Sequence, residues 1–507
     1  MTMTTLDRDL QSIQQARDLV AKARQAQQNF LSASQADVDR ICEAMAAAAY
    51  DASARLGTMA HEETGYGVPK HKRLKNEFAS KQVWESIRDE KTVGVIFHDS
   101  TKKIYHIGWP MGVVAALTPS TNPTSTVMFK ILIAVKTRNA IVLAPHPASI
   151  NCCLETTRLM VEAGVRAGMP PGLVSCMSSV SLEGTQALME HRHTAVILAT
   201  GGAGMVKAAH SVGKPAYGVG PGNVPCYVDR SADIKQAAHY IVSSKAFDCS
   251  VICATEQAVI ADKPIAASLK AEMMALGAHF VTRAEADALG RTLFASSGAI
   301  DAKSVGKTPQ QLAHLAGITV PQSAKILVAP LTKVGPDEPL SREKLTTVLG
   351  WYEANGWEAG CDLCMDLIMF GGRGHSLFIH AQDDDIILKF GLEKPVFRIG
   401  VNTMGTMGSI GITTAIEPSM TLGSGGIGGS ISGDNISARH LLNVKRLAYE
   451  TKPPPAAAMI DDWQEKTAQR QSQTAIANNQ VEHLVEDIVK QVLNELKKHD
   501  PEILGNV

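Results

Sequence analysis

Short apolar runs that alternate with helical stretches constrain the fold of this chain most strongly. Three such runs, each bounded by glycine, proline or polar turns, occupy residues 112–117, 140–144 and 195–199. A stretch with helical character, 125–136, lies between the first two. Repeated strand, helix and strand segments predict a mainly parallel sheet, because parallel strands need long crossover connections that helices supply. We therefore expect an α/β fold.

The rest of the chain extends this pattern. At 507 residues the chain is too long for one ordinary hydrophobic core, so two or three domains are expected. Residues 1–90 carry apolar side chains at helical spacing and predict helices. A second α/β block is expected from 226 to about 430, with strands at 257–260 and 376–380.

Composition excludes several classes of function. Hydrophobic residues make up 45% and charged residues 20% of the chain, which is typical of a globular protein. The formal net charge of −1 provides no broad field for holding a polyanion, so nucleic acid is not an expected partner. No run approaches the ~18 apolar residues that a membrane helix needs. Residues 1–29 lack an apolar stretch, which predicts neither a signal peptide nor a membrane anchor.

The nine cysteines show no paired spacing of metal ligands. Cys361 and Cys364 form a single CxxC motif without a second pair, so no zinc or other metal site is expected. The odd number of cysteines is typical of a protein in the reducing cytosol.

The composition changes sharply after residue 447. Residues 451–480 are rich in Pro, Ala, Gln and Asn and predict a flexible linker. Residues 481–499 predict an amphipathic helix, because apolar side chains recur at i, i+3, i+4 and i+7. A helix of this length is marginal alone in water, so its apolar face needs a partner. That partner is either a subunit of the same protein or a groove on another protein.

One thiol and one amide are candidate reactive groups. Cys253 ends a loop that contains Asp248 and Ser250, and such loops often present nucleophiles. Asn122 lies in a polar turn where Pro123 biases it away from helix, so its amide can project. An amide donor there can stabilise an oxyanion on a substrate held by the thiol. Taken singly, an inert core cysteine and a plain turn asparagine are the commoner interpretations.

Two glycine-rich segments accompany these residues. Residues 200–204 precede a helical stretch, and backbone N–H groups at such a helix start suit a pyrophosphate. The spacing is not GxGxxG, and a turn of this kind can also simply reverse the chain. Residues 218–225 are too rich in glycine to predict regular structure. They are expected to connect the two blocks, a place that can border an active cleft.

Together these segments resemble the CoA-acylating aldehyde dehydrogenases, nearest to the bacterial microcompartment type and to the aldehyde half of bifunctional aldehyde–alcohol dehydrogenases. The resemblance covers about residues 7–447. The motifs that carry it are residues 118–130, 136–140, 213–215, 218–225, 247–257, 371–375 and 418–423. Coincidence is not a serious alternative for so many motifs in the same order.

The resemblance implies a two-lobed α/β fold of the aldehyde dehydrogenase type, assembled as a homodimer or homotetramer. A Rossmann-type NAD-binding lobe is expected first and an α/β catalytic lobe second. The expected segments are the NAD-binding lobe (1–225, with an oligomerisation segment near 98–115), the catalytic lobe (226–430), a closing oligomerisation segment (431–450), the linker (451–480) and the amphipathic helix (481–499).

The resemblance also assigns roles to single residues. Cys253 matches the family's nucleophile, and Asn122 matches the amide that holds the oxyanion. Glu343 resembles the glutamate that positions the nicotinamide ribose, while Gly201 and Gly202 match the turn beneath the cofactor pyrophosphate. Cys249 and His375 are expected to be structural, although His375 could also act as a proton shuttle or contact CoA.

The remaining expected cofactor-binding residues are Thr118, Pro119, His146, Thr200 and Gly218. His146 stands where hydrolytic aldehyde dehydrogenases have a lysine that grips the adenosine ribose. That grip is therefore in question, and NAD is expected in preference to NADP.

Gly218 indicates the reaction. Hydrolytic relatives have a glutamate here that activates water, whereas glycine can neither accept a proton nor orient water. A thioester on Cys253 would then persist until the thiolate of CoA attacks it. The expected activity is oxidation of a short aldehyde, such as acetaldehyde or propionaldehyde, to its acyl-CoA. The alternatives are hydrolysis to the free acid, a sulfoacetaldehyde substrate, and an inactive scaffold whose tail recruits partners.

The tail resembles the encapsulation peptides of microcompartment enzymes. It therefore predicts a cytoplasmic protein inside a bacterial microcompartment, with a shell protein bound at residues 481–499.

Overall fold

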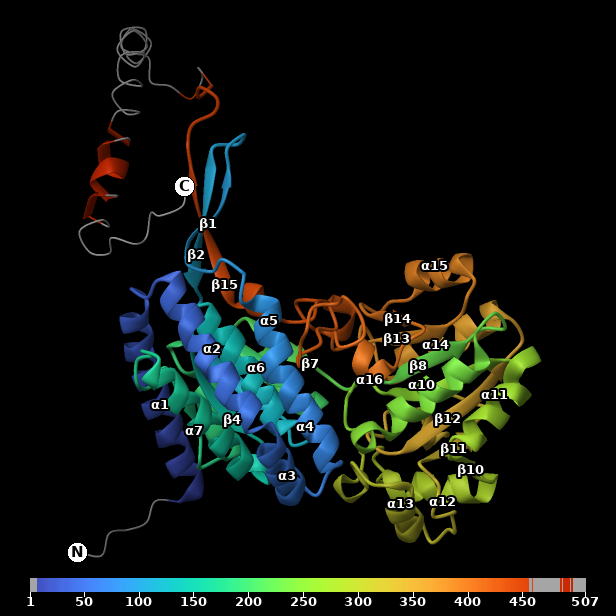
Figure 1. Ribbon diagram of the computed structural model, residues 1–507. Helices are drawn as coiled ribbons and strands as arrows, with labels where there is room; N and C mark the ends of the chain where they lie inside the picture. Colours follow the sequence, from blue (N-terminus) through green and yellow to red (C-terminus); the bar gives the residue numbers. More distant parts are fainter. Residues whose placement is uncertain (1–6, 456–457, 459–483, 486, 493, 496–507) are drawn as a thin grey trace, which may run out of the picture. The chain divides into compact units, whose positions relative to one another are not determined.

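The computed structural model describes residues 7–455, 458, 484–485, 487–492 and 494–495 (Figure 1). Residues 1–97 and 106–446 form one unit, and residues 98–105 and 447–507 form another. Each unit is described by itself. No helix among the described residues is long and apolar enough to cross a membrane.

The chain begins with helices, as predicted for the first ninety residues. These are α1 (Arg8–Phe30), α2 (Gln35–Asp51), α3 (Ser53–Thr64), α4 (Pro69–Glu77), the π-helical turn η1 (Phe78–Gln82) and α5 (Val83–Ile87). Local sequence explains where α2 begins: the Ser34 hydroxyl accepts a hydrogen bond from the Asp37 N–H, and the Asp37 carboxylate accepts one from the Ser34 N–H, a reciprocal capping box. Helix α4 begins at Pro69, whose missing N–H costs nothing in the first turn.

A five-stranded sheet of order β5-β4-β3-β6-β7 follows, and all its pairings are parallel. The predicted runs are its strands, and the predicted helix between the first two is α6. The elements are β3 (Val113–Thr118), α6 (Pro123–Lys136), β4 (Ala140–Pro145), α7 (Ile150–Arg166), β5 (Val174–Cys176), α8 (Leu182–Glu190), β6 (Thr194–Thr200), α9 (Ala203–Ser211) and β7 (Ala216–Val219).

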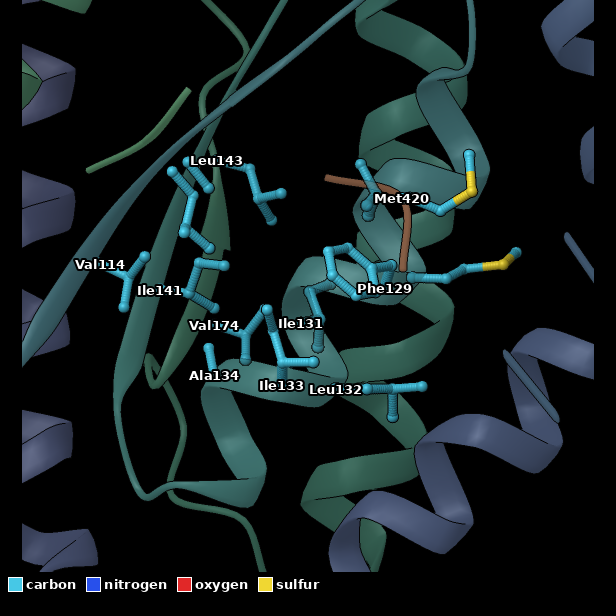
Figure 2. Close-up of a cluster of buried hydrophobic side chains, with 14 of the residues drawn as sticks. Val114, Phe129, Ile131, Leu132, Ile133, Ala134, Ile141, Leu143, Val174 and Met420 are labelled. Carbon is cyan, nitrogen blue, oxygen red and sulfur yellow. The ribbon is translucent and has the colours of Figure 1, made fainter. Parts of the chain in front are cut away.

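Helix α6 lies at the centre of this part of the core. All of its residues are buried, including the charged Lys130 and Lys136. Figure 2 shows Ile131 and Ile133 of α6 on the side of the strand residues Val114 and Ile141, whereas Leu132 points away from these strands. Removal of such apolar surface from water contributes about 25 cal/mol per Å².

A second sheet has seven parallel strands in the order β10-β11-β12-β9-β8-β13-β14. The predicted strands at 257–260 and 376–380 correspond to β9 and β13. Its strands are β8 (Val224–Val228), β9 (Glu256–Asp262), β10 (Ala278–Phe280), β11 (Ile326–Pro330), β12 (Val348–Ala354), β13 (Leu377–His380) and β14 (Ile399–Val401). Its helices are α10 (Ile234–Ala246), α11 (Lys263–Ala275), α12 (Arg283–Leu293), α13 (Pro309–Ala316), α14 (Trp357–Gly371) and α15 (Asp384–Glu393).

After β14 the chain adds side chains to the hydrophobic core around α6. Helix α16 (Gly405–Gly408) and the following loops carry buried side chains, including Met407, Leu422 and Leu441, into that core. A three-stranded sheet of order β1-β2-β15 also occurs, built from β1 (Gly94–Asp99), β2 (Ile104–Pro110) and β15 (Leu442–Ala448). The predicted domain boundaries stay a prediction.

Two predictions about irregular segments can be compared with the structure. The expectation of no regular structure over 218–225 is wrong at both ends, because Gly218 lies in β7 and Val224 begins β8. Only the four residues between the two strands form the connection. Of the predicted helix 481–499, the described residues are helical, with exposed Leu484 and Ile488. Its other residues, and 456–457 and 459–480 of the predicted linker, lie outside the described residues.

Two identical substitutions test the importance of the α6 core. Leu132 is fully buried, so Leu132→Ala is expected to reduce the free energy of unfolding by about 2–5 kcal/mol. Leu392 on α15 is 78% exposed, so Leu392→Ala is expected to change it by less than about 0.5 kcal/mol. Denaturant unfolding of both variants measures the difference, and equal losses would contradict this description of the core.

Candidate active site

A cavity of about 360 Å³ brings most of the predicted site residues together. Loops that follow β3, β4, β6 and β7 contribute to it from the first sheet, at the carboxyl ends of these parallel strands. Segments that lead into β8, β9 and β12 contribute from the second. The predicted residues that line it are Pro119, Asn122, His146, Thr200, Gly201, Gly202, Cys253 and Glu343. Open α/β sheets commonly bind ligands at such strand ends.

Cys253 is partly exposed and lies in the segment between the turn η3 (Phe247–Ser250) and β9. Asp248, Cys249 and Ser250 just before it all have left-handed backbone conformations, with φ of 48°, 50° and 66°. Three successive non-glycine residues in this region are strained and persist only where surrounding contacts hold them. The loop that presents the thiol is therefore held in an unusual shape.

Burial raises the pKa of the Cys253 thiol to about 12, and the Glu343 carboxylate adds to this increase. The Arg398 guanidinium and the backbone N–H groups of Cys253 and Ala254 act in the opposite direction. The thiol is therefore protonated at neutral pH and must lose its proton before it can act as a nucleophile.

Asn122 precedes the first turn of α6 and points its amide at the thiol loop. Its Nδ2 donates a hydrogen bond to the Val251 carbonyl at 2.9 Å, two residues before Cys253. Its Oδ1 accepts a hydrogen bond from the buried ammonium of Lys75. The same nitrogen also donates to the Thr121 hydroxyl at 3.3 Å, and an oxyanion on the Cys253 substrate would need an N–H donor of this kind in place of that hydroxyl.

The start of α9 fits the pyrophosphate of a dinucleotide. Gly202 immediately precedes this nine-residue helix, and no side chain caps its first N–H groups. A Cβ atom at Gly202 or Gly204 would meet nothing within 4 Å, so there is space for a ligand next to these donors. Helix N-termini with free N–H groups bind anions.

A second hollow extends this region. A groove of about 310 Å³ lies between α8 and α9 and is lined by Leu182, Met189, Met205 and Ala208 among others. Its largely apolar walls suit a flat aromatic ring such as adenine. The sequence does not reveal this groove, because its residues are ordinary apolar side chains on two different helices.

Glu343 and His146 both line the cavity. Glu343 Oε1 accepts a hydrogen bond from the Gly222 N–H at 2.9 Å, and burial raises the pKa of Glu343 to about 7. His146 follows β4, and its Nδ1 accepts a hydrogen bond from the Ala148 N–H at 3.1 Å. Partial burial lowers the pKa of His146, so the imidazole is neutral at physiological pH.

Two predicted cofactor-binding residues, Thr118 and Gly218, are not among the residues that line the cavity. The Thr118 hydroxyl is buried against the Ala144 carbonyl, at 3.5 Å. Gly218 lies in β7, where a Cβ atom would come within 2.5 Å of the His210 ring on α9. The space beside Gly218 is therefore filled by a neighbouring side chain, which sequence alone cannot show.

The predicted structural role of His375 stays a prediction. Its ring is buried, and burial together with Arg398 lowers its pKa to about 3. Nδ1 lies 3.0 Å from the Ser376 hydroxyl, and a Cβ atom at Gly222 would come within 3.1 Å of the ring and would collide with the Cys253 carbonyl oxygen.

Sequence reasoning missed Lys72, Lys75 and Thr126. The two lysines lie on α4 and form buried ion pairs with Asp248 of the thiol loop. Thr126, one turn into α6, lines the cavity, and its hydroxyl has no hydrogen-bond partner among the described residues. Nothing in the local sequence marks the lysines of α4 as partners of Asp248, and nothing marks Thr126 within α6 as a residue of the cavity.

Comparison with known proteins agrees with this geometry. The profile of the aldehyde dehydrogenase family matches residues 7–287. The chain belongs to the aldehyde dehydrogenase family. Aldehyde-alcohol dehydrogenase 2 of Entamoeba histolytica is 42% identical over 85% of this chain and 51% of its own length. The present chain therefore spans about half the length of that curated relative.

Solved structures of family members share the fold over nearly the whole chain. An acetylating aldehyde dehydrogenase from Geobacillus thermoglucosidasius is 47% identical, covers 89% of this chain and 100% of its own, and has a TM-score of 0.88. A Rhodopseudomonas palustris propionaldehyde dehydrogenase with bound CoA and an acylated cysteine is 27% identical, with coverage of 86% and 97% and a TM-score of 0.79. The predicted resemblance to the CoA-acylating aldehyde dehydrogenases is confirmed.

A further structural relative comes from a microcompartment. The propionaldehyde dehydrogenase of the Clostridium phytofermentans fucose utilisation microcompartment is 26% identical, with coverage of 85% and 96% and a TM-score of 0.77.

The raised pKa of Glu343 makes stability depend on pH. Between pH 4.5, its ordinary pKa, and about 7, the folded protein keeps a proton that the unfolded chain releases. The contribution of Glu343 to the free energy of unfolding therefore falls as the pH rises from 4.5 to about 7. Glu343→Gln removes the charge but keeps the acceptor oxygen. At pH 8 the free energy of unfolding of the variant should exceed that of the parent by at most roughly 3 kcal/mol, and at pH 5 by much less.

Urea unfolding of both proteins at the two pH values measures this gain. An equal difference at pH 5 and pH 8 would contradict the raised pKa.

Proposed function

We propose that this protein oxidises a short, neutral aldehyde to its acyl-CoA thioester, with NAD as the hydride acceptor. The observation that carries the proposal is one cavity that holds a thiol, an amide donor and a helix N-terminus suited to a pyrophosphate. The bound CoA and acylated cysteine named for the Rhodopseudomonas relative support the same chemistry.

The reaction follows from the positions of Cys253 and Asn122. The Cys253 thiol releases its proton to solvent water, and Sγ forms a bond to the aldehyde carbon, which breaks the C=O π bond and converts the carbonyl oxygen into an oxyanion. The Asn122 Nδ2–H and the Cys253 backbone N–H donate to that oxyanion. Bound NAD would supply the acceptor for the hydride that leaves the same carbon. The thioester then stays on Cys253 until the CoA thiolate attacks it and displaces the Cys253 thiolate.

Residues next to the first sheet would hold most of the cofactor, and Glu343 of the second would complete the site. The N–H groups at the start of α9 would bind the pyrophosphate, the groove between α8 and α9 would receive the adenine, and Glu343 would bind the nicotinamide ribose. No lysine or arginine occurs among the described residues that line the cavity, and His146 is neutral. A 2′-phosphate would have no cation to pair with, which favours NAD over NADP.

The same lining favours a neutral aldehyde. Tyr66, Ile300, Val305 and Leu345 form apolar walls near Cys253. Burial of a sulfonate or a second carboxylate needs a cationic partner. The described lining residues provide none, so acetaldehyde and propionaldehyde fit better than sulfoacetaldehyde.

A requirement for CoA tests the reaction directly. NADH formation from propionaldehyde should need CoA after a single turnover, because no carboxylate stands at Gly218 to activate water. Cys253→Ala should abolish turnover, while Cys249→Ala serves as a matched control that keeps most of it. The assay follows NADH absorbance with and without CoA. Sustained NADH formation without CoA would instead establish the hydrolytic alternative.

The tail is proposed to deliver the enzyme to a microcompartment in the cytoplasm. Its described residues present an exposed apolar face that includes Leu484, Val485, Ile488 and Val492. An amphipathic helix of this kind fits a groove on a shell protein. The microcompartment origin named for the Clostridium relative supports this context.

A variant that lacks residues 456–507 tests this role. It should keep full CoA-dependent activity and the native oligomer mass, but should no longer co-purify with shell protein. Loss of the native oligomer, measured by light scattering, would show that the tail binds the enzyme's own subunits instead.

A further inference from the structure

A buried cluster of three charges lies behind the proposed active site. Lys72 and Lys75 on α4 and Asp248 in the thiol loop have side chains that are at most 2% exposed. The Lys75 ammonium contacts Asp248 Oδ2, and the Lys72 ammonium lies 3.4 Å from the same oxygen. Charges are seldom buried without a specific reason, because desolvation costs each ion several kcal/mol.

Asp248 anchors the strained loop that presents Cys253. Its Oδ1 accepts a hydrogen bond from the Val68 N–H at 2.6 Å, and its own N–H donates to His71 Nδ1 at 2.9 Å. Gly67 packs so closely that a Cβ atom there would overlap the Asp248 carboxylate. The region around α4 therefore holds the left-handed start of the loop.

The two lysines reach the turn of Asn122 by different bonds. Lys72 donates to the Thr121 backbone carbonyl at 3.0 Å, which fixes the chain but no side chain. Lys75 donates to Oδ1 of the Asn122 amide itself. Both lysines are buried, lie on α4 and pair with Asp248. They differ in the atom of the Asn122 turn that they bind, which is a backbone carbonyl for Lys72 and the side-chain amide oxygen for Lys75.

The bond from Lys75 decides which way the Asn122 amide faces. A carboxamide has an acceptor end and a donor end of nearly the same shape. With an ammonium at Oδ1, the NH₂ group must face the Val251 carbonyl and the Thr121 hydroxyl. The flipped amide would set NH₂ against the ammonium and oxygen against the Val251 oxygen, which leaves both ends unpaired.

We propose that Lys75 is a positioning residue for the reaction: it orients the Asn122 amide so that its NH₂ end, and not its oxygen, faces the site of the oxyanion. The inference rests on the proposed function, in which Asn122 is the oxyanion donor.

The charge state of Lys75 agrees with this role. Burial lowers its pKa to about 8, while Asp248 opposes the decrease and Lys72 adds to it. The amine is therefore mainly protonated at neutral pH and can donate to Asp248 and Asn122 together.

A double-mutant cycle with Asn122 tests the proposal in the full-length enzyme. Removal of one oxyanion donor typically costs about 10²–10³-fold in kcat, which is the expectation for Asn122→Ala. Lys75→Met should lower kcat by at least about tenfold and change the aldehyde KM by less than about threefold, because the donor acts chiefly in the transition state. The Lys75→Met/Asn122→Ala double variant should be no slower than Asn122→Ala alone within about twofold.

Lys72→Met is the matched control. It removes the other buried ammonium of the same ion cluster, so its loss of thermal stability should resemble that of Lys75→Met. Its effect on kcat should combine with Asn122→Ala multiplicatively, since Lys72 does not bind the amide. Lys75→Gln keeps an N–H donor in the same place, so it should recover part of the kcat lost in Lys75→Met. It also serves as the test variant if Lys75→Met does not fold.

The outcomes separate this inference from the proposed function. If Asn122→Ala lowers kcat but combines multiplicatively with the Lys75 variant, the positioning role is wrong and the oxyanion role stands. If Asn122→Ala leaves kcat unchanged, both are wrong. Alkylation of Cys253 by iodoacetamide, followed by mass spectrometry, should proceed at similar rates in Lys75→Met and the parent. A large change in that rate would show that Lys75 acts on the thiol loop as a whole and would overturn the proposal.

Discussion

Both faces of a parallel sheet must be buried, and this requirement shapes the molecule. Each strand is followed by a crossover that covers the sheet, so successive loops gather at the carboxyl ends of the strands. In the first sheet these loops carry Asn122, His146 and Gly202 into one cavity. The second sheet contributes through the segments that enter its strands, including Cys253 and Glu343. The site thus combines loops that leave strands of the first sheet with segments that enter strands of the second.

Burial of apolar surface stabilises this arrangement, and the buried charges fix the orientation of particular polar groups. Helix α6 is buried over its whole length and holds Asn122 at its start. The contacts of Lys72 and Lys75 with Asp248 cost desolvation energy that a hydrophobic cluster would not. In return, they connect α4, the Asn122 turn and the strained loop before Cys253. A directional hydrogen bond can orient an amide, whereas apolar packing cannot distinguish its two ends.

Pattern reasoning succeeded where local physics decides the outcome. The apolar runs at β3, β4 and β6 and the helix between the first two follow from burial on both sides of a sheet. Cys253 and Asn122 were candidates from their loop and turn, and their roles came from the resemblance to the acylating aldehyde dehydrogenases; these roles stay a prediction. The same reasoning was wrong for residues 218–225, where Gly218 and Val224 belong to strands. Glycine lowers strand preference, but pairing with neighbouring strands outweighs that loss.

The sequence by itself determined the fold class, the order of strands and helices, and the two residues on which the chemistry is proposed to depend. Only the tertiary structure decided that Thr118 is buried away from the cavity, that His210 fills the space beside Gly218, and that Lys75 holds the Asn122 amide. The physical reason is distance along the chain. Residues 75, 122 and 248 meet through folding alone, and nothing in their local sequence records which charged side chain will be buried against which partner.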